Sequence, residues 1–213
     1  MESLNRHTDY GTKALSESHL PANPFDGFAL WLKDAEAAGI YEPNAFVLGT
    51  VDSMGAPNAR TVLLKGLQGE SFFFATNYKS QKGLEIGQGA AVSMVFGWYA
   101  MHRQVIVQGF ASKSSAESSE EYFQSRPHDS QVASLVSQQS QPIESRAKLE
   151  EAYESALSEF QGKQVPTPPN WGGYLIEPTR IEFWQGRTSR MHDRISFTRE
   201  STESNWQVQR LQP

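Results

Sequence analysis

The sequence predicts a mainly β protein of the α+β class, in which an antiparallel, barrel-like sheet carries peripheral helices. About eight or nine short segments have the β-branched and aromatic composition of strands, and they follow one another mostly in chain order. The predicted helices gather at the start and in the middle of the chain. A doubly wound parallel sheet needs strands and helices in regular alternation, which this sequence lacks.

The 213 residues are expected to form one large domain, residues 23–213, preceded by an arm. Residues 1–22 are polar, and their apolar side chains are too scattered for a core face, which predicts a flexible N-terminal arm. The domain begins with a predicted amphipathic helix at Pro24–Ala38. Its apolar residues recur at spacings of three and four: Phe25, Phe28 and Leu32.

A strand-rich block follows this helix. The predicted strands are Ala45–Val51, Arg60–Lys65, Ser71–Thr76, Ala90–Phe96 and Gln104–Ala111. The first two flank the turn-like residues 52–57, which predicts a hairpin with a longer loop. Between the third and the fourth strand, we expect a short helix at Ser80–Ile86.

Three helices are predicted in the middle of the chain, at Ser114–Gln124, Ser130–Gln141 and Ser145–Phe160. The spacing of Ser118 and Glu121 matches a capping box, but a start of the first helix at Ser114 or Ser115 is equally consistent with the sequence. Pro127 must end this helix, because a residue before proline avoids the helical region. The chain then returns to predicted strands at Gly173–Ile176, Arg180–Trp184, Ile195–Arg199 and Trp206–Leu211.

Composition and charge exclude several classes of protein. The absence of cysteine excludes disulfide frameworks, thiolate metal sites and cysteine nucleophiles, and it fits a reducing, cytoplasmic compartment. A net charge of −5 argues against nucleic acid as a partner, so a bound anion needs a local cluster of cations. No apolar run approaches the roughly 20 residues of a membrane helix, and the N-terminus has no signal-peptide core. The five histidines lack metal-ligand spacing, so we expect no metal.

The most informative stretch for chemistry is Arg190–Arg194. If it is extended, Arg190, His192 and Arg194 point to one side of a strand. Two guanidinium groups and an imidazole beside the indole of Trp184 would suit a planar anionic ligand or a phosphate. The alternative is a solvated strand edge whose charges discourage aggregation, and the pattern alone leaves both interpretations open.

Three further cations are candidate ligands for an anion. Arg60 and Lys65 bracket an apolar strand and, five residues apart, face opposite sides unless the strand bends or ends near Lys65. The alternative for both is a strand-end side chain that reaches toward water. Lys82, near the start of a short predicted helix, is a candidate phosphate ligand or an ordinary exposed lysine.

A second cluster is predicted around Pro127. Tyr122 and Arg126 would end one helix, and Asp129 or Ser130 would cap the next. This arrangement brings a phenol, a guanidinium and a helix N-terminus together, as a phosphate site requires. Routine capping beside a surface arginine is the alternative.

Several familiar catalytic motifs are absent. The sequence has neither of the glycine-rich phosphate-binding loops nor a nucleophile elbow. The remaining cations, aromatic rings and amides suit a phosphorylated aromatic molecule, in a protein that leaves the difficult chemistry to a cofactor.

Seven ordered segments carry a resemblance to a known family. They are Arg60–Lys65, Arg103–Val105, Tyr122–Gln131, Gln139–Ser140, Trp171–Gly173, Ile181–Gly186 and Arg190–Arg194. Together, from about Pro21 to Pro213, they resemble pyridoxamine 5′-phosphate oxidase, the FMN enzyme family that makes pyridoxal 5′-phosphate.

The resemblance implies an FMN-binding split β-barrel homodimer with two FMN sites at the interface. The FMN-binding residues that it implies are Arg60, Val62, Lys65, Thr76, Lys82, Gln104, Gln139, Ser140, Trp184 and Arg194, some of them from the partner subunit. The substrate-binding residues that it implies are Lys65, Tyr122, Arg126, Ser130, Arg190 and His192. Arg190 and His192 would lie over the substrate ring, opposite the flavin, and are the catalytic candidates.

The implied activity is the oxidation of pyridoxamine 5′-phosphate and pyridoxine 5′-phosphate by O2, with H2O2 as the second product. A flavin reductase, an oxidase for another phosphorylated substrate and a flavin-binding protein without turnover are the alternatives. The sequence departs from the family at Gln81, where an arginine is frequent, and at Ala75, where an aromatic residue is frequent. The N-terminal arm keeps Tyr10, which can cover the site in the family, without the basic residues that usually precede it.

Overall fold

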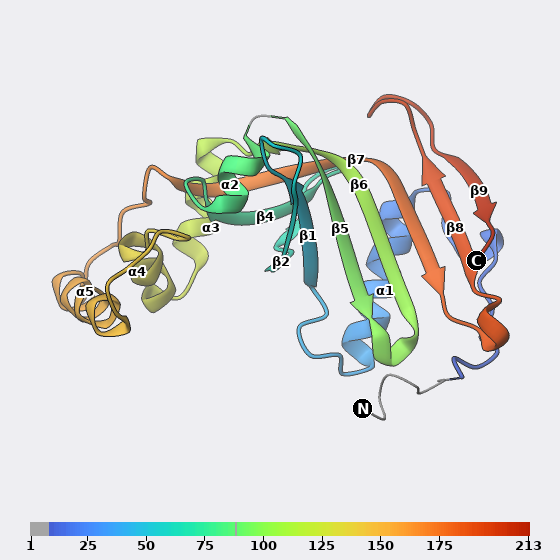
Figure 1. Cartoon of the computed structure of the whole chain (residues 1–213), viewed down its shortest axis with the longest axis horizontal. Helices are drawn as coiled ribbons and strands as arrows, with labels where there is room; N and C mark the ends of the chain where they lie inside the picture. The colour runs from blue at the N-terminus through green and yellow to red at the C-terminus, as the bar shows by residue number, and fades with distance from the viewer. Residues whose placement is uncertain (1–8, 88) are drawn as a thin grey trace.

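A curled antiparallel sheet of nine strands forms the body of the protein in this computed structural model, which describes residues 9–87 and 89–213. The strands are β1 (Ala45–Val51), β2 (Pro57–Leu63), β3 (Gly66–Leu67), β4 (Phe72–Asn77), β5 (Ala90–Trp98), β6 (Arg103–Lys113), β7 (Trp171–Gln185), β8 (Asp193–Thr198) and β9 (Gln207–Leu211). The path β2-β1-β5-β6-β7-β4-β3 curls into a split barrel, and β8 and β9 extend the sheet beyond β7 (Figure 1). The predicted barrel-like antiparallel fold is confirmed.

The long strand β7 joins the two parts of this sheet. It pairs with β6 along its length, with β4 through Trp171–Ile176 and with β8 through Arg180–Gln185. The prediction of two separate strands in this region was therefore wrong. Pro178, which has no N–H to donate, lies at a register shift opposite Gly109, so the bulge accommodates it without ending the strand.

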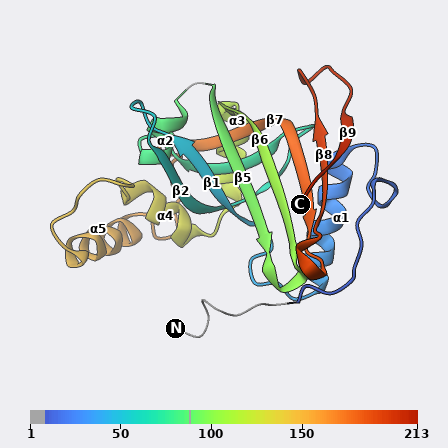
Figure 2. The ribbon, with the colours of Figure 1, turned by 45° about the vertical axis from the view of Figure 1, so that its right-hand side comes forward.

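Among the described residues, five α-helices surround the sheet: α1 (Pro24–Ala37), α2 (Gln81–Ile86), α3 (Ala116–Ser125), α4 (His128–Val136) and α5 (Arg146–Glu159). Figure 2 shows α1 crossing the barrel beside β7 and β8, whereas α4 and α5 project from its opposite side. α1 begins where the Asn23 side chain accepts a hydrogen bond from Phe25 N, and it ends before Gly39, whose φ of +69° suits a glycine.

The core is mainly aromatic. Phe28 on α1 is fully buried, with ring centroids 4.8 Å from Phe96 and 5.0 Å from Phe72. Edge-to-face pairs of this kind add about 0.5–1.5 kcal/mol to the burial of the rings. A smaller cluster around Phe123, Val132 and Trp171 anchors α3 and α4 to the start of β7.

Some predicted boundaries changed. The helix after β6 is capped by Ser115, which settles the choice between its alternative starts. α4 begins at His128 after Pro127, so the prediction that Asp129 or Ser130 caps it was wrong. The buried Gln131 makes this tight connection possible, because its side-chain amide donates to two carbonyls of the preceding turn.

The described part of the arm, residues 9–22, lies against β8 and β9. Leu15 and Leu20 join the main core, contrary to the expectation that the arm has no core-facing residues. Leu15 N donates to Asp193 at 3.0 Å, and Arg210 pairs with both Asp193 and Glu17. These contacts fasten residues 15–20 to the sheet edge. The flexibility of residues 1–22 stays a prediction, and residues 1–8 lie outside the described part.

The bulge opposite Pro178 yields a stability prediction. A Cβ at Gly109 would lie 2.7 Å from the Pro178 Cα and would also overlap the Glu177 carbonyl. We expect Gly109→Ala to lower the free energy of unfolding by about 1–3 kcal/mol, because backbone must move. Thermal denaturation should show a fall in Tm of roughly 3–10 °C. Gly66→Ala, where a Cβ meets open space, is the control; equal Tm values for both variants would contradict the prediction.

Candidate functional site

A buried lysine without an anionic partner is the centre of the first group of site residues, the Lys82 cluster (Arg60, Thr76, Lys82 and Gln139). Lys82 Nζ lies 3.4 Å from Thr76 Oγ1 and 3.3 Å from Gln139 Oε1, and these two oxygens are 3.1 Å apart. Lys82 is 8% exposed. No carboxylate in the described residues lies within ion-pair distance of its ammonium group. Burial, and next the charge of Arg60, lower the pKa of Lys82, so the cluster favours an added anion.

The short helix α2 holds Lys82 in this position. Ser80 caps the helix by accepting from Gly83 N, and its hydroxyl donates to Asn77 O at 2.7 Å. Gly83 packs so closely on Asn77 and Tyr78 that a Cβ would meet backbone atoms. The loop after β4 therefore fixes the start of α2, and Lys82 points back toward the end of that strand.

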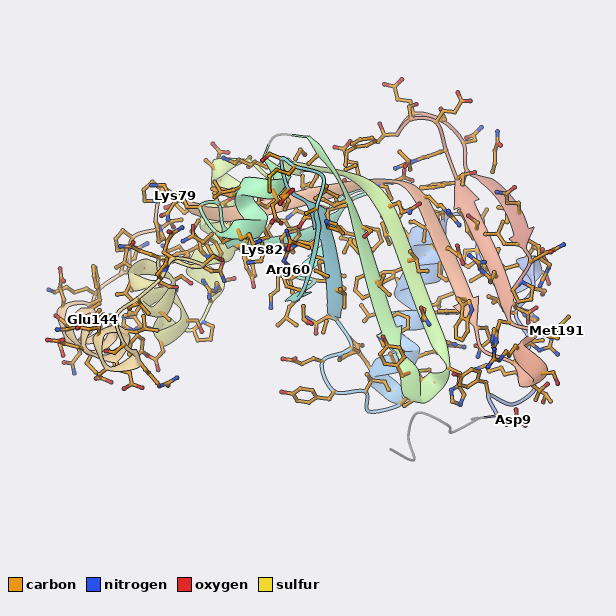
Figure 3. All side chains as sticks on the ribbon, in the orientation of Figure 1. Asp9, Arg60, Lys79, Lys82, Glu144 and Met191 are labelled. Carbon is orange, nitrogen blue, oxygen red and sulfur yellow. The ribbon has the colours of Figure 1, made fainter. Side chains whose placement is uncertain are left out.

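Arg60, on β2, completes the Lys82 cluster. Its guanidinium donates to Glu85 at 2.9 Å and to the hydroxyl of Thr50 on the neighbouring strand β1. Val62, two residues further along β2, packs against the core. Figure 3 shows Arg60 and Lys82 side by side where β2 meets α2. Arg60 and Lys82, which the sequence offered as separate candidate ligands for an anion, thus lie close together, and sequence reasoning missed Glu85 beside them.

The second group, the Arg126 cluster (Lys65, Tyr122, Arg126 and Ser130), lies between β2, α3 and α4. Arg126 stacks 4.9 Å from the centre of the Trp171 ring, and its Nη1 donates to Ser134 Oγ at 2.7 Å. Tyr122 stacks on the same indole with ring planes 14° apart. Sequence reasoning did not name Trp171 as a site residue, yet it orients both the phenol and the guanidinium.

Lys65 belongs to this cluster because β2 ends before it. The strand stops at Leu63, and Lys65 N donates to Phe73 O at 2.8 Å, which confirms that the strand ends near Lys65. Burial, and then the positive charge of Arg126, lower the pKa of Lys65. Arg126 and Ser130 also line a pocket of about 470 Å³ between α4, α5 and β7. The positive charges of Lys65 and Arg126 repel each other, and Arg126 lines the pocket, so an anionic ligand is favoured there.

The third group, the Trp184 cluster (Gln104, Trp184, His192 and Arg194), lies at the other end of β7. Gln104, Trp184 and Arg194 are direct register partners across β6, β7 and β8. The His192 ring lies 4.7 Å from the Trp184 ring, and the Tyr10 ring of the arm contacts both. Arg194 forms a bidentate pair with the buried Glu182, at 2.6 and 3.1 Å.

The condition that Arg190–Arg194 is extended, on which the shared strand face depended, is not met by its first residues. Thr188–Arg190 forms a turn of 3-10 helix, and Arg190 has a φ of +60°. Strand β8 begins only at Asp193. Arg190 is therefore exposed on a loop beside His192, and it does not share a strand face with Arg194.

Hydrogen bonding defines the proton position on His192. Arg187 N donates to His192 Nδ1 at 3.0 Å, so Nδ1 accepts and the neutral ring carries its proton on Nε2. Burial and the nearby charge of Arg190 lower the pKa of His192. His192 thus offers a neutral Nε2–H donor near pH 7.

The three groups do not meet within one chain. The Lys82 cluster and the Arg126 cluster lie near the β4 end of β7, and Gln139 and Ser140 lie in the loop after α4. Figure 3 shows Met191, beside His192, far from Arg60 and Lys82. In the described part of the chain we find no group of three potential metal ligands among His, Cys, Asp and Glu. None of its helices has the length and apolar character needed to span a membrane.

Two family models match the chain. The model described as pyridoxamine 5′-phosphate oxidase matches residues 32–160, and the pyridoxine 5′-phosphate oxidase C-terminal dimerisation region matches residues 171–213. Curated relatives named pyridoxine/pyridoxamine 5′-phosphate oxidase are similar over almost the whole chain. The Bacteroides thetaiotaomicron protein is 45% identical over 205 residues, and the Paraburkholderia phytofirmans protein 46% over 205 residues, each covering 96% of both chains.

Solved structures show the same fold. PhzG from Burkholderia lata, in complex with tetrahydrophenazine-1-carboxylic acid, is similar with a TM-score of 0.89 and 26% identity. The match covers 96% of this chain and 100% of PhzG. A pyridoxamine 5′-phosphate oxidase-related, FMN binding protein from Nostoc punctiforme has a TM-score of 0.72 at 16% identity, covering 90% of this chain and 98% of its own, which supports the fold.

The hydrogen bond to His192 yields a spectroscopic prediction. We expect long-range 1H–15N NMR to show the proton of the neutral His192 ring on Nε2, and a pKa below 6.5. Arg190→Gln should move this pKa upward, whereas Lys148→Gln on α5 should not. Since the folded-state pKa is lowered, stability is lost as the pH falls below about 6.5. A neutral ring with its proton on Nδ1 would refute the assignment.

Proposed function

Because the chain belongs to the pyridoxamine 5′-phosphate oxidase family, we propose that it is an FMN-dependent oxidase of vitamin B6 phosphates in the cytoplasm. Pyridoxine 5′-phosphate and O2 give pyridoxal 5′-phosphate and H2O2. Pyridoxamine 5′-phosphate, O2 and water give the same aldehyde, ammonia and H2O2. The observation that carries this proposal is the presence of two separate cationic clusters, one for the phosphate of each of two ligands.

The Lys82 cluster suits the phosphate of FMN. Lys82 is a buried cation whose contacts are neutral oxygens, and the guanidinium of Arg60 adds a second positive charge beside it. A phosphate dianion would supply the missing counter-charge. We assign Thr76, Gln139 and Ser140 to the same ligand, with Val62 on β2 and Lys65 just after the end of that strand beside it.

The Arg126 cluster suits the phosphate of the substrate. Lys65 and Arg126 provide charge, while Tyr122 and Ser130 provide hydroxyl donors. Trp171 fixes the plane of Arg126, so the guanidinium is oriented before a ligand arrives. A phosphate held by these residues would position the substrate ring, and the Arg126 cluster itself would take no part in the chemistry.

The Trp184 cluster then requires a second copy of the chain. Thr76 pairs with Gly172 and Arg194 with Trp184, so the two clusters are separated by about 40 Å of extended strand. One flavin ring system cannot reach both in the same chain. We propose a homodimer in which the partner brings Gln104, Trp184 and Arg194 to the FMN held by Lys82, and the matching dimerisation region supports it.

The side chains orient the reactants, and FMN when bound supplies the two-electron acceptor that O2 reoxidises. His192 presents its Nε2–H toward the substrate ring and remains neutral, so it donates a hydrogen bond without adding charge. Arg190, exposed beside it, covers the ring from the same loop. Arg194 is held by Glu182, which fixes the guanidinium near the flavin. Because Arg180 also pairs with Glu182, the three side chains keep one net positive charge.

An oxidase for another aromatic substrate is the second candidate. The similarity to PhzG, whose structure contains tetrahydrophenazine-1-carboxylic acid, favours it. The higher identity to the pyridoxine/pyridoxamine 5′-phosphate oxidases favours the first candidate. The Arg126 cluster also favours the first, because two cations and two hydroxyl groups gathered in one cluster suit a phosphate.

The direct test is anaerobic. Purified protein is loaded with FMN, mixed with pyridoxine 5′-phosphate, and followed by flavin absorbance before air is admitted. We expect bleaching that reverses with O2, together with one pyridoxal 5′-phosphate per flavin reduced. Flavin that remains oxidised with both vitamin B6 phosphates, but is reduced by NADH or by a non-phosphorylated aromatic acid, would instead support a reductase or the second candidate.

The Arg126 cluster yields a kinetic prediction. Arg126→Gln should raise KM for pyridoxine 5′-phosphate by about 10- to 100-fold, because a charged hydrogen bond to the phosphate is lost. FMN affinity should stay unchanged, since the residue lies outside the Lys82 cluster. Arg146→Gln is the matched control: Arg146 lines the same pocket but is exposed and pairs with Glu150. Equal KM values for the two variants would contradict the assignment.

A further inference from the structure

Glu85, at the end of α2, is held against the Lys82 cluster by three side chains. Its Oε2 accepts from Arg60 at 2.9 Å and from Thr50 at 2.5 Å, and its Oε1 accepts from Asn58 at 2.7 Å. The Glu85 side chain is 6% exposed. Both carboxylate oxygens are therefore engaged, and Arg60 cannot turn away without leaving a buried anion unpaired.

The strand register makes this arrangement rigid. Thr50 on β1 and Asn58 on β2 are direct cross-strand partners, and Arg60 follows Asn58 on the same side of β2. α2 brings Glu85 over this pair from a helix that also carries Lys82. The carboxylate thus bridges the hairpin and the helix at the edge of the proposed phosphate site.

Glu85 is charged and acts on both cations. Burial alone would raise the pKa of Glu85, but the hydrogen bonds from Thr50 and Arg60 outweigh it and hold that pKa below its ordinary value. The charge of Glu85 also raises the pKa of Lys82, against the effects of burial and of Arg60. One fixed anion therefore offsets part of the charge of two cations.

On the basis of the proposed FMN site, we propose that Glu85 is a built-in counter-anion of the flavin phosphate cradle. Glu85 positions Arg60 and cancels part of the positive charge of Arg60 and Lys82. The Lys82 cluster is therefore stable without a ligand, and its affinity for the FMN phosphate is limited. Gln81, exposed and neutral at the start of α2, adds no further cation. A phosphate dianion would consequently bind next to a net charge of +1, the sum of the charges of Arg60, Lys82 and Glu85.

A purely structural role for Glu85 predicts a different outcome. If the carboxylate served only to anchor Arg60, its loss would free the guanidinium and weaken FMN binding. If it serves as a counter-anion, removal of its charge strengthens the attraction between the cradle and phosphate. Glu85→Gln separates the two roles, because glutamine retains a hydrogen-bond acceptor of the same length without the charge.

The experiment compares FMN with riboflavin, which has the same ring system and no phosphate. Binding to wild type and Glu85→Gln is measured by quenching of flavin fluorescence at low and high salt, and the Tm of each flavin-free protein is measured. We expect Glu85→Gln to bind FMN about 3- to 30-fold more tightly, with the gain reduced at high salt. Riboflavin affinity should be unchanged, and the flavin-free Tm should fall.

The control is Glu70→Gln, which changes the net charge equally and breaks an ion pair with Arg199, the residue after β8. It should leave FMN affinity unchanged. FMN affinity of Glu85→Gln that is equal to or weaker than wild type overturns the proposal, as does an equal gain for riboflavin. A variant that folds only with FMN supports it, whereas one that fails to fold even with FMN overturns it. Wild type that binds no FMN overturns the proposed function as well.

Discussion

The pairing of β7 with β6, β4 and β8 is the constraint on which the placement of the candidate site depends. A strand that is paired on both edges cannot slip by one residue without turning its buried face to solvent. At one end, Gly172 fixes Thr76 on β4, and at the other end Trp184 fixes Gln104 and Arg194. Side chains that are remote in sequence are thereby held in fixed rows, so a ligand meets an organised surface.

The second general feature is the burial of positive charge without full compensation. Lys82, Lys65 and Arg126 all have pKa values lowered first by burial. Such an arrangement reduces the stability of the empty protein and increases what an anionic ligand contributes when it binds. Arg194 and Arg60 form ion pairs with Glu182 and Glu85. Lys82, Lys65 and Arg126 form no such pair among the described residues, so they mark the positions where the charge of a ligand is needed.

The sequence predicted what local pattern controls, and it missed what depends on contacts between distant segments. Composition and alternation predicted the order of the strands, and the turn at residues 52–57 predicted the hairpin. The left-handed backbone of Arg190 and the start of α4 at His128 follow from packing, which periodicity does not report. Glu85 escaped notice because its partner Arg60 comes from another element, and no spacing rule connects them.

The position of β7 in the chain also determines when the protein can fold during synthesis. β4 ends at Asn77, yet the part of β7 that pairs with it, around Gly172, emerges from the ribosome almost one hundred residues later. β6 also cannot complete its pairing until β7 has been made. Pairings across so long a stretch close slowly, and until then the edges of β4 and β6 are open to other strands. A nascent chain stopped before residue 171 would therefore expose two sheet edges, which makes it a client for chaperones.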